Sequence, residues 1–230
     1  NDLQGKKILI TAGPTYERID PVRFIGNFSS GKMGFSLAEE CAQRGAEVLL
    51  IAGPTALKTM HPRIGRIDVE SAQQMHDAAV SAFPRMDAAI LSAAVADYRP
   101  LRSRPEKMKR EGQEEFSLTL TTNPDIAASL GQMKEAHQAL IGFALETNDE
   151  LLNARKKLER KNLDFIVLNS LQDEGAGFGG DTNKVTILSR EGNKTSFGLK
   201  SKKEVAKDIV DIVFHVGPSH PIQDNSVKTG

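Results

Sequence analysis

Residues 23–34 read RFIGNFSSGKMG and combine glycines, serines, an asparagine and two cations immediately before an apolar helical pattern. A glycine-rich loop that leads into a helix presents backbone N–H groups and the positive end of the helix dipole, which together bind phosphate. Gly31 would allow close approach, Ser30 would supply a hydroxyl group, and Lys32 would add charge. The pattern fits an anion site and equally fits an ordinary capped helix start, so the residues alone leave both interpretations open.

Lysines elsewhere in the chain have spacings that suit phosphate binding. Lys157 and Lys161 are four residues apart on a predicted helix and would share one face of it. Lys107 lies in a charged, proline-bearing stretch over 98–115, and irregular chain of that length often forms a lid or a binding loop. Each lysine alone is more often a solvated surface charge. Together with the glycine-rich helix start they fit a triphosphate, because lysine acts as a point charge on phosphate oxygens.

The elements that must position these residues alternate between apolar runs of strand length and helical patterns. Uncharged apolar strands are typical of a parallel sheet whose two faces are covered by helices. We therefore expect an α/β fold with a Rossmann-like, mostly parallel sheet, helices on both faces, and a C-terminal β-hairpin and helix. The expected strands are 6–13, 46–53, 87–95, 138–145 and 164–170, and the expected helices are 31–45, 71–83, 123–134 and 148–162.

The C-terminal part follows a different pattern. Residues 183–198 indicate two strands around a Glu-Gly-Asn turn, and residues 201–216 indicate an amphipathic helix. Residues 217–230 are polar, contain prolines and lack periodicity, so we expect a disordered tail. The sequence thus predicts a single domain over residues 1–216.

Two local features refine this outline. Residues 14–30 form a connection between the first strand and the first helix that is far longer than usual, which favours a functional loop. Asn123 is expected to open the helix over 123–134, because asparagine is a preferred cap, and Pro124 suits the first helical position.

The composition excludes several classes of protein. The 230 residues carry 30 basic and 30 acidic side chains, whereas a protein that binds duplex nucleic acid normally has a basic excess. No apolar run approaches the roughly 20 residues of a membrane-spanning helix. The single cysteine, Cys41, rules out an intrachain disulfide, and its apolar helical surroundings favour a place in the core. We therefore expect a cytoplasmic protein that binds neither nucleic acid nor membranes.

The usual dinucleotide fingerprints are missing from this scaffold. A Rossmann site needs its glycines directly after the first strand and an acid at the end of the second. Here Gly31 lies far from Gly13, and the second strand ends in Ile-Ala-Gly at 51–53. A Tyr-x-x-x-Lys pair is also missing, since Arg102 follows Tyr98 at that spacing. A nicotinamide-dependent Rossmann-type oxidoreductase stays an alternative, as does a non-catalytic nucleotide-binding domain.

Seven motifs occur in an order that resembles phosphopantothenoylcysteine synthetase of the bacterial, CTP-using type. That family is often the C-terminal half of a bifunctional protein whose N-terminal half is a flavin-dependent decarboxylase. Because this chain begins with Asn1 rather than methionine, we expect it to be a piece of such a fusion, with no flavin in this domain. The motifs are TAGPT (11–15), DPVRFIGNFSSGKMG (20–34), SAAVADYRP (92–100), PEKMK (105–109), NPDI (123–126), GFALETN (142–148) and RKNLDFIVLN (160–169).

The resemblance implies a two-step ligation. The carboxylate of 4′-phosphopantothenate attacks the α-phosphate of CTP to give an acyl-cytidylate and pyrophosphate, and the amine of L-cysteine then displaces CMP. Mg²⁺ is expected to accompany the triphosphate, held by phosphate oxygens and water. No dedicated metal site is expected, because the five histidines show no ligand spacing. The resembled family is dimeric, so we expect a homodimer, with the hairpin 183–198 as a candidate for pairing.

The resemblance also implies roles for individual residues. Asn27 and Lys107 would be catalytic, Asn27 by donating a hydrogen bond in the conversion of the acyl-cytidylate and Lys107 by binding the triphosphate. Arg23, Asn27 and Ala94 would bind the acid substrate. Leu145 stands where the family has alanine, which would change the volume of the pocket. The nucleotide would be bound by Gly13, Ser30, Gly31, Ser92, Ala93, Asp97, Lys107, Asn123, Pro124, Asp125, Ile126, Phe143, Lys157 and Lys161.

Overall fold

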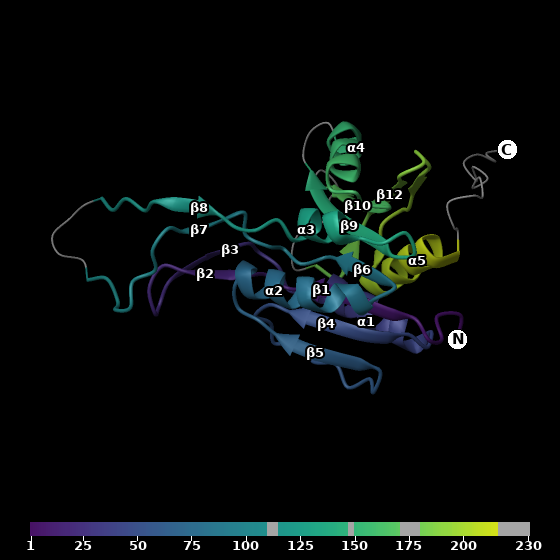
Figure 1. The fold of residues 1–230 in the computed structure, drawn as a ribbon, viewed down its shortest axis with the longest axis horizontal. Helices are drawn as coiled ribbons and strands as arrows, with labels where there is room; N and C mark the ends of the chain where they lie inside the picture. The colour runs from purple at the N-terminus through teal and green to yellow at the C-terminus, as the bar shows by residue number, and fades with distance from the viewer. Residues whose placement is uncertain (110–114, 147–149, 171–179, 216–230) are drawn as a thin grey trace.

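The structure, a computed structural model, describes residues 1–109, 115–146, 150–170 and 180–215. The strands of its central sheet are β1 (Lys7–Ala12), β4 (Glu47–Ala52), β5 (Ile64–Asp68), β6 (Ala88–Leu91), β9 (Ala139–Glu146), β10 (Phe165–Ser170), β12 (Val185–Ser189) and β13 (Lys194–Ser196). They lie in the order β13-β12-β10-β9-β6-β1-β4-β5 (Figure 1). The pairs from β10 to β5 are parallel, and β12 and β13 add antiparallel pairs at one edge.

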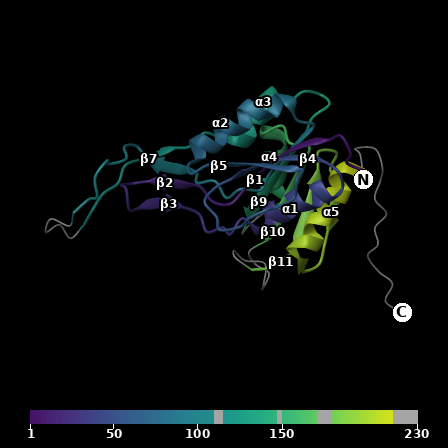
Figure 2. The ribbon, with the colours of Figure 1, turned by 90° about the horizontal axis from the view of Figure 1, so that it is seen from below.

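Two separate cores flank this sheet, because successive residues of each strand face opposite sides. Ile8 and Ile10 belong to one core, whereas Leu9 between them belongs to the other. Figure 2 shows α1 and α5 on one side of the sheet and α2 and α3 on the other, and α4 packs into the same core as α2 and α3. The helices are α1 (Lys32–Gln43), α2 (Ala72–Ala82), α3 (Ile126–Met133), α4 (Glu150–Arg160) and α5 (Lys202–His215). The predicted fold class is confirmed.

The sequence-based outline differs from the structure at three elements. The edge strand β5 was not expected, because its residues are mostly exposed and it lacks an apolar run. The strand expected over 87–95 ends at Leu91, and beyond it the chain keeps only an isolated parallel bridge between Ala94 and Pro14. The prediction that Asn123 opens α3 was wrong: Asp125 is the cap, and its side chain accepts a hydrogen bond from the Ala128 amide at 3.0 Å.

The two long loops of the sequence form a projecting arm. Within them, β2 (Tyr16–Arg18) pairs with β3 (Phe24–Gly26), and β7 (Tyr98–Pro100) pairs with β8 (Leu120–Thr122), both antiparallel. We call residues 16–26 and 98–122, apart from 110–114, the arm. It extends away from the sheet in both ribbon views (Figures 1 and 2). Part of each expected long connection is therefore an antiparallel ladder, whereas residues 19–23, 101–109 and 115–119 are irregular chain.

The C-terminal part closes the α1 side of the sheet. The predicted hairpin is present as β12 and β13, with Gly192 at φ 92° in its turn. A short antiparallel ladder of β11 (Thr182–Asn183) and β14 (Lys200–Ser201) leads into α5. The predicted tail over 217–230 lies outside the described residues. Among the described residues, no helix is long and apolar enough to cross a membrane.

Cys41 is fully buried in α1 and belongs to the core between α1, α5 and the sheet. Burial raises the pKa of its thiol to about 12. A thiol in that state is a poor nucleophile, because the thiolate is the reactive form. The expectation that Cys41 is a core residue is confirmed.

Candidate functional site

A pocket opens at the carboxyl ends of the parallel strands, where the sheet order reverses. The chain runs from β1 outward to β4 and β5, and then from β6 outward through β9 to β10. Ligands of open α/β sheets bind at this switch point between neighbouring strands. The pocket has a volume of about 1140 Å³ and is lined by the loop before α1, the segment after β6, the start of α3 and the end of α4. That volume exceeds the roughly 300–1,000 Å³ of a usual small-molecule site, so it has room for more than one substrate.

The glycine-rich loop forms one wall of the pocket by close approach of three backbone segments. Gly31 precedes α1 with φ 80°, and a Cβ on it would lie 3.3 Å from the Cα of Gly13 at the end of β1. Gly13 in turn has φ 80° and faces the backbone of Gly53 after β4. Ser29 accepts a hydrogen bond from the Gly31 amide at 3.2 Å, and Ser30 accepts one from the Lys32 amide at 3.4 Å. The start of α1 lines the pocket, and the side chains of these two serines accept from its Gly31 and Lys32 amides.

Gly34, in the first turn of α1, gives a direct test of this packing. A Cβ on Gly34 would lie 2.5 Å from the Cβ of Ala12 and 2.7 Å from the hydroxyl of Ser92, closer than real contacts allow. In an exposed helix, alanine is more stable than glycine by about 1 kcal/mol. Here we expect Gly34→Ala to lower the free energy of unfolding by about 1–3 kcal/mol, as overpacking does. Urea unfolding followed by circular dichroism measures the change.

Gly198→Ala is the matched control for this test. A Cβ on Gly198 would meet nothing within 4 Å. The control should change the free energy of unfolding by less than about 0.5 kcal/mol. A Gly34→Ala protein as stable as the wild type would show that α1 does not press on β1 and the segment after β6.

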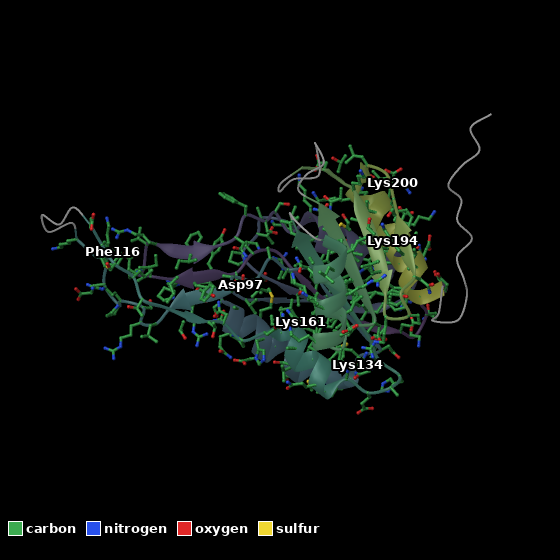
Figure 3. All side chains as sticks on the ribbon, turned by 90° about the horizontal axis from the view of Figure 1, so that it is seen from above. Asp97, Phe116, Lys134, Lys161, Lys194 and Lys200 are labelled. Atoms are coloured by element: carbon green, nitrogen blue, oxygen red, sulfur yellow. The ribbon has the colours of Figure 1, made fainter. Side chains whose placement is uncertain are left out.

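Two asparagine side chains form hydrogen bonds with the backbone of the segment after β6. Asn27 donates from Nδ2 to the carbonyl oxygen of Val95 at 3.0 Å. Asn123 donates from Nδ2 to the carbonyl oxygen of Ala96 at 2.7 Å, and its amide donates to the carbonyl oxygen of Asp97 at 2.8 Å. These bonds hold Asp97 at the edge of the pocket, between the arm and the sheet (Figure 3).

The start of α3 and the end of α4 meet on the opposite wall. The Nζ of Lys161 lies 3.0 Å from Oδ2 of Asp125. Burial of the Asp125 carboxyl group opposes its ionisation, but the Ala128 amide and Lys161 outweigh that effect, so the pKa of Asp125 is lowered. Lys157 lies one turn before Lys161 and also lines the pocket. This wall therefore combines a helix N-terminus with two lysines.

The structure brings most of the predicted site residues together. The predicted residues that line this one pocket are Asn27, Ser30, Gly31, Ser92, Ala93, Ala94, Asp97, Asn123, Pro124, Asp125, Ile126, Phe143, Lys157 and Lys161. Gly13 lies directly behind Gly31. Leu145, where the resembled family has alanine, also lines the pocket.

Arg23 and Lys107 lie elsewhere, on the arm. Neither is among the described residues that line the pocket. Arg23 donates from a guanidinium nitrogen to the carbonyl oxygen of Met108 at 3.0 Å, and the Met108 amide donates to Asp20 at 3.3 Å. Asp20 is buried and also accepts hydrogen bonds from the amides of Val22 and Arg23 at 2.8 Å. The arm thus holds the predicted substrate arginine beside the predicted triphosphate lysine, but away from the pocket of the same chain.

Several residues that line the pocket were not predicted from the sequence. Thr11 accepts a hydrogen bond at its carbonyl oxygen from the Ser92 hydroxyl at 2.7 Å. Lys202 lies in the first turn of α5, where a cation is unfavourable because of the helix dipole. Two lysines at 202–203, at the start of a predicted helix, could therefore have indicated an anion site. The missed lining residues include Thr11, Asn169, Asn183 and Lys202.

Comparison with known proteins identifies the family. The sequence profile described as "DNA/pantothenate metabolism flavoprotein C-terminal domain" matches residues 3–216. The chain belongs to this family. The match covers every element of the fold and every residue assigned to the pocket, so the family and the site coincide.

Solved and curated members of the family are similar over nearly the whole chain. The crystal structure of the C-terminal domain of the coenzyme A biosynthesis bifunctional protein CoaBC matches with a TM-score of 0.80 and 44% identity, covering 94% of this chain and 97% of that domain. CoaBC of Vibrio vulnificus strain CMCP6 is 46% identical over 93% of this chain and 54% of its own length. A protein of an unknown prokaryote, named cysteine/cysteine sulfinic acid decarboxylase, is 54% identical over 90% of this chain and 58% of its own length. The chain spans about half the length of the curated relatives it matches.

Proposed function

We propose that this chain is a phosphopantothenate–cysteine ligase that uses CTP and acts in coenzyme A biosynthesis. The observation that carries the proposal is the pocket: of the residues that the resemblance assigns to the site, all but Gly13, Arg23 and Lys107 line it. The name of the CoaBC relatives and the match to a CoaBC C-terminal domain support the assignment to coenzyme A biosynthesis.

The proposed reaction activates a carboxylate and then forms an amide. A carboxylate oxygen of 4′-phosphopantothenate bonds to the α-phosphorus of CTP, the bond to the bridging oxygen breaks, and pyrophosphate leaves. The cysteine nitrogen then bonds to the acyl carbon, the acyl carbon–oxygen bond breaks, and CMP leaves. The cysteine ammonium group gives up two protons in this step. Phosphoryl attachment matters because oxide is a poor leaving group, whereas CMP is a good one.

The pocket offers a group for each demand of this chemistry. The start of α3 and the lysines at the end of α4 suit the phosphates, because both present positive charge. Asn27 donates one N–H to Val95, so its amide group is held in a fixed direction. A second N–H of the same group can donate to the acyl oxygen as negative charge develops there, which stabilises the transition state.

The Mg²⁺ of this reaction would arrive with CTP. Among the described residues, no group of three or more His, Cys, Asp or Glu side chains is placed to hold a metal ion. The donor set therefore suits an ion bound mainly by phosphate oxygens and water, which is the usual coordination of Mg²⁺ with nucleotides.

The direct test is a product assay with defined omissions. The protein, mixed with MgCTP, 4′-phosphopantothenate and L-cysteine, should release pyrophosphate and CMP in equal amounts. Without cysteine it should release pyrophosphate only once per site, because the acyl-cytidylate stays bound. CTP binding without pyrophosphate release would support a non-catalytic nucleotide-binding domain instead. Reduction or oxidation of a nicotinamide cofactor would support the oxidoreductase alternative. Replacing CTP with ATP in the same assay measures the preference for the base.

We also infer that two chains pair through the arm. The arm exposes large apolar side chains, including Val22, Phe24, Tyr98, Leu101 and Phe116. A second copy is the partner that fits, because the arm holds Arg23 and Lys107 away from its own pocket and could bring them to another. The edge strand β13 of the predicted hairpin exposes none of the large apolar side chains, so it is the weaker candidate.

Subunit mixing tests this pairing. Light scattering should give twice the mass of one chain. An Arg23→Ala protein and an Asn27→Asp protein, each inactive alone, should regain activity when mixed, because one of the two pockets would then carry both native residues. A monomer, or no recovery on mixing, would contradict pairing through the arm. We also propose that this chain is fused to a decarboxylase domain, and the bifunctional nature of the CoaBC relatives supports a fusion. The cytoplasmic location stays a prediction.

A further inference from the structure

The pocket has a second charged end that the roles assigned above leave unused. Lys32 in the first turn of α1 and Lys202 in the first turn of α5 both line it. The Nζ of Lys32 lies 2.6 Å from Oδ1 of Asp181. Lys202 donates from Nζ to the carbonyl oxygen of Gly180. Two lysines of the pocket and the carboxylate of Asp181, which is not itself among the described lining residues, therefore lie together at this end.

Backbone pairing fixes the cluster in place. The ladder of β11 and β14 ends at Ser201, and the next amide, that of Lys202, donates to the carbonyl oxygen of Asp181 at 2.9 Å. Asn183, which also lines the pocket, donates from its side chain to the sulfur of Met33 at 3.8 Å. The starts of α1 and α5 are thus joined through residues 181–183, and the two lysines are held near each other.

The two lysines occupy positions that the helix dipoles disfavour. Each lies at a helix N-terminus, where the dipole disfavours a cation. Lys202 is only 9% exposed. Burial and the charge of Lys32 both lower the pKa of Lys202, and Asp181 only partly offsets them. Asp181 itself is 85% exposed in its side chain, so it leaves the buried lysine largely uncompensated. The arrangement points to an anionic group of a ligand.

We propose that Lys32 and Lys202 bind the carboxylate of the amino-acid substrate, and that Asp181 accepts a hydrogen bond from its ammonium group. This inference rests on the proposed ligase function. An α-amino acid is a zwitterion and offers one group to the lysines and the other to Asp181. A triphosphate offers negative charge only, and the other end of the pocket, with Lys157 and Lys161, already suits it.

The location also suits the second step of the reaction. Asn27 and Lys32 belong to the same loop-to-helix junction, and both line the pocket. An amino acid held by its carboxylate at Lys32 would have its nitrogen near the acyl carbon that Asn27 is proposed to polarise. Positioning of this kind converts an encounter between two molecules into a step within one complex.

The test compares L-cysteine with cysteamine, which has the same amine and thiol but no carboxylate. The wild type should prefer L-cysteine. We expect Lys202→Gln to raise KM for L-cysteine by about tenfold, equivalent to about 1.4 kcal/mol, and to leave KM for cysteamine nearly unchanged. Lys32→Gln should act in the same direction. Lys203→Gln is the control, because Lys203 is the next residue on α5 but is exposed and not among the described lining residues.

The burst of one pyrophosphate per site in the absence of cysteine distinguishes failure of the ligase proposal from failure of the subsite proposal. If the wild type releases none, the ligase proposal fails first. If the burst keeps its amplitude in Lys202→Gln but the preference for L-cysteine over cysteamine is unchanged, the subsite proposal alone is wrong. A raised KM for CTP with an unchanged KM for L-cysteine would also overturn it, since the lysines would then bind phosphate. A burst of full amplitude shows in each case that the variant is folded.

Discussion

Asn27→Asp should release pyrophosphate once per site and then stop, with the acyl-cytidylate retained on the protein. In the proposed reaction, nucleotide activation would not need the Asn27 amide, whereas attack by the cysteine nitrogen would develop negative charge that a donor such as this amide stabilises. Aspartate is an acceptor and adds a charge of the wrong sign. Loss of one such donor slows the step by about a hundred- to a thousandfold. Quenched-flow detection of pyrophosphate, with mass spectrometry of the bound intermediate, measures both halves of the prediction.

Asn193→Asp is the control that carries the same chemical change. Asn193 is exposed, in the turn between β12 and β13, and is not among the described residues that line the pocket. It should turn over at the wild-type rate. Normal turnover by Asn27→Asp would show that the Asn27 side chain has no part in the reaction beyond its contact with Val95. Loss of the pyrophosphate burst as well would place Asn27 in the first step rather than the second.

The fold could be predicted because strands buried on both faces have recognisably apolar sequences. β1 and β4 are apolar over nearly their whole length, since each is covered on both faces. β5 has no apolar run, because an edge strand with exposed residues need not be apolar. The start of α3 was misplaced by two residues, because Asn123 and Asp125 are both good caps and only tertiary contacts decide between them. Asn123 is held by Ala96 and Asp97 instead.

The site could be predicted wherever its residues belong to contiguous motifs. Asn27, Asp97 and Asn123 lie in segments whose order resembles the family, and the strand order brings them to one pocket. Lys202 could not be placed in this way, because its position depends on the pairing of β11 with β14. Lys107 was expected at the pocket because it belongs to a loop. The contacts of neighbouring Met108 with Asp20 and Arg23 hold that part of the loop on the arm.

Joint substitution of Lys157 and Lys161 by glutamine should slow pyrophosphate release by about a hundredfold or more. A charge-assisted hydrogen bond contributes about 1.5–3 kcal/mol, and each 1.4 kcal/mol in the barrier corresponds to about a tenfold change in rate. The change should appear in the absence of cysteine, because these lysines are proposed to bind phosphate in the first step. Lys161 also contacts Asp125, so Lys161→Gln alone should weaken the α3 start as well.

Lys156→Gln is the matched control for the pair, because Lys156 lies on the same helix, is exposed, and is not among the described lining residues of the pocket. The Lys157/Lys161 and Asn27 substitutions then affect different steps of the reaction. The lysine pair should affect the step that consumes CTP, and Asn27 should affect the step that consumes cysteine. If the lysine variant keeps a normal pyrophosphate burst but forms the amide slowly, the lysine pair acts in the second step instead. The triphosphate would then have to lie at the α1 and α5 end of the pocket, beside Lys32 and Lys202.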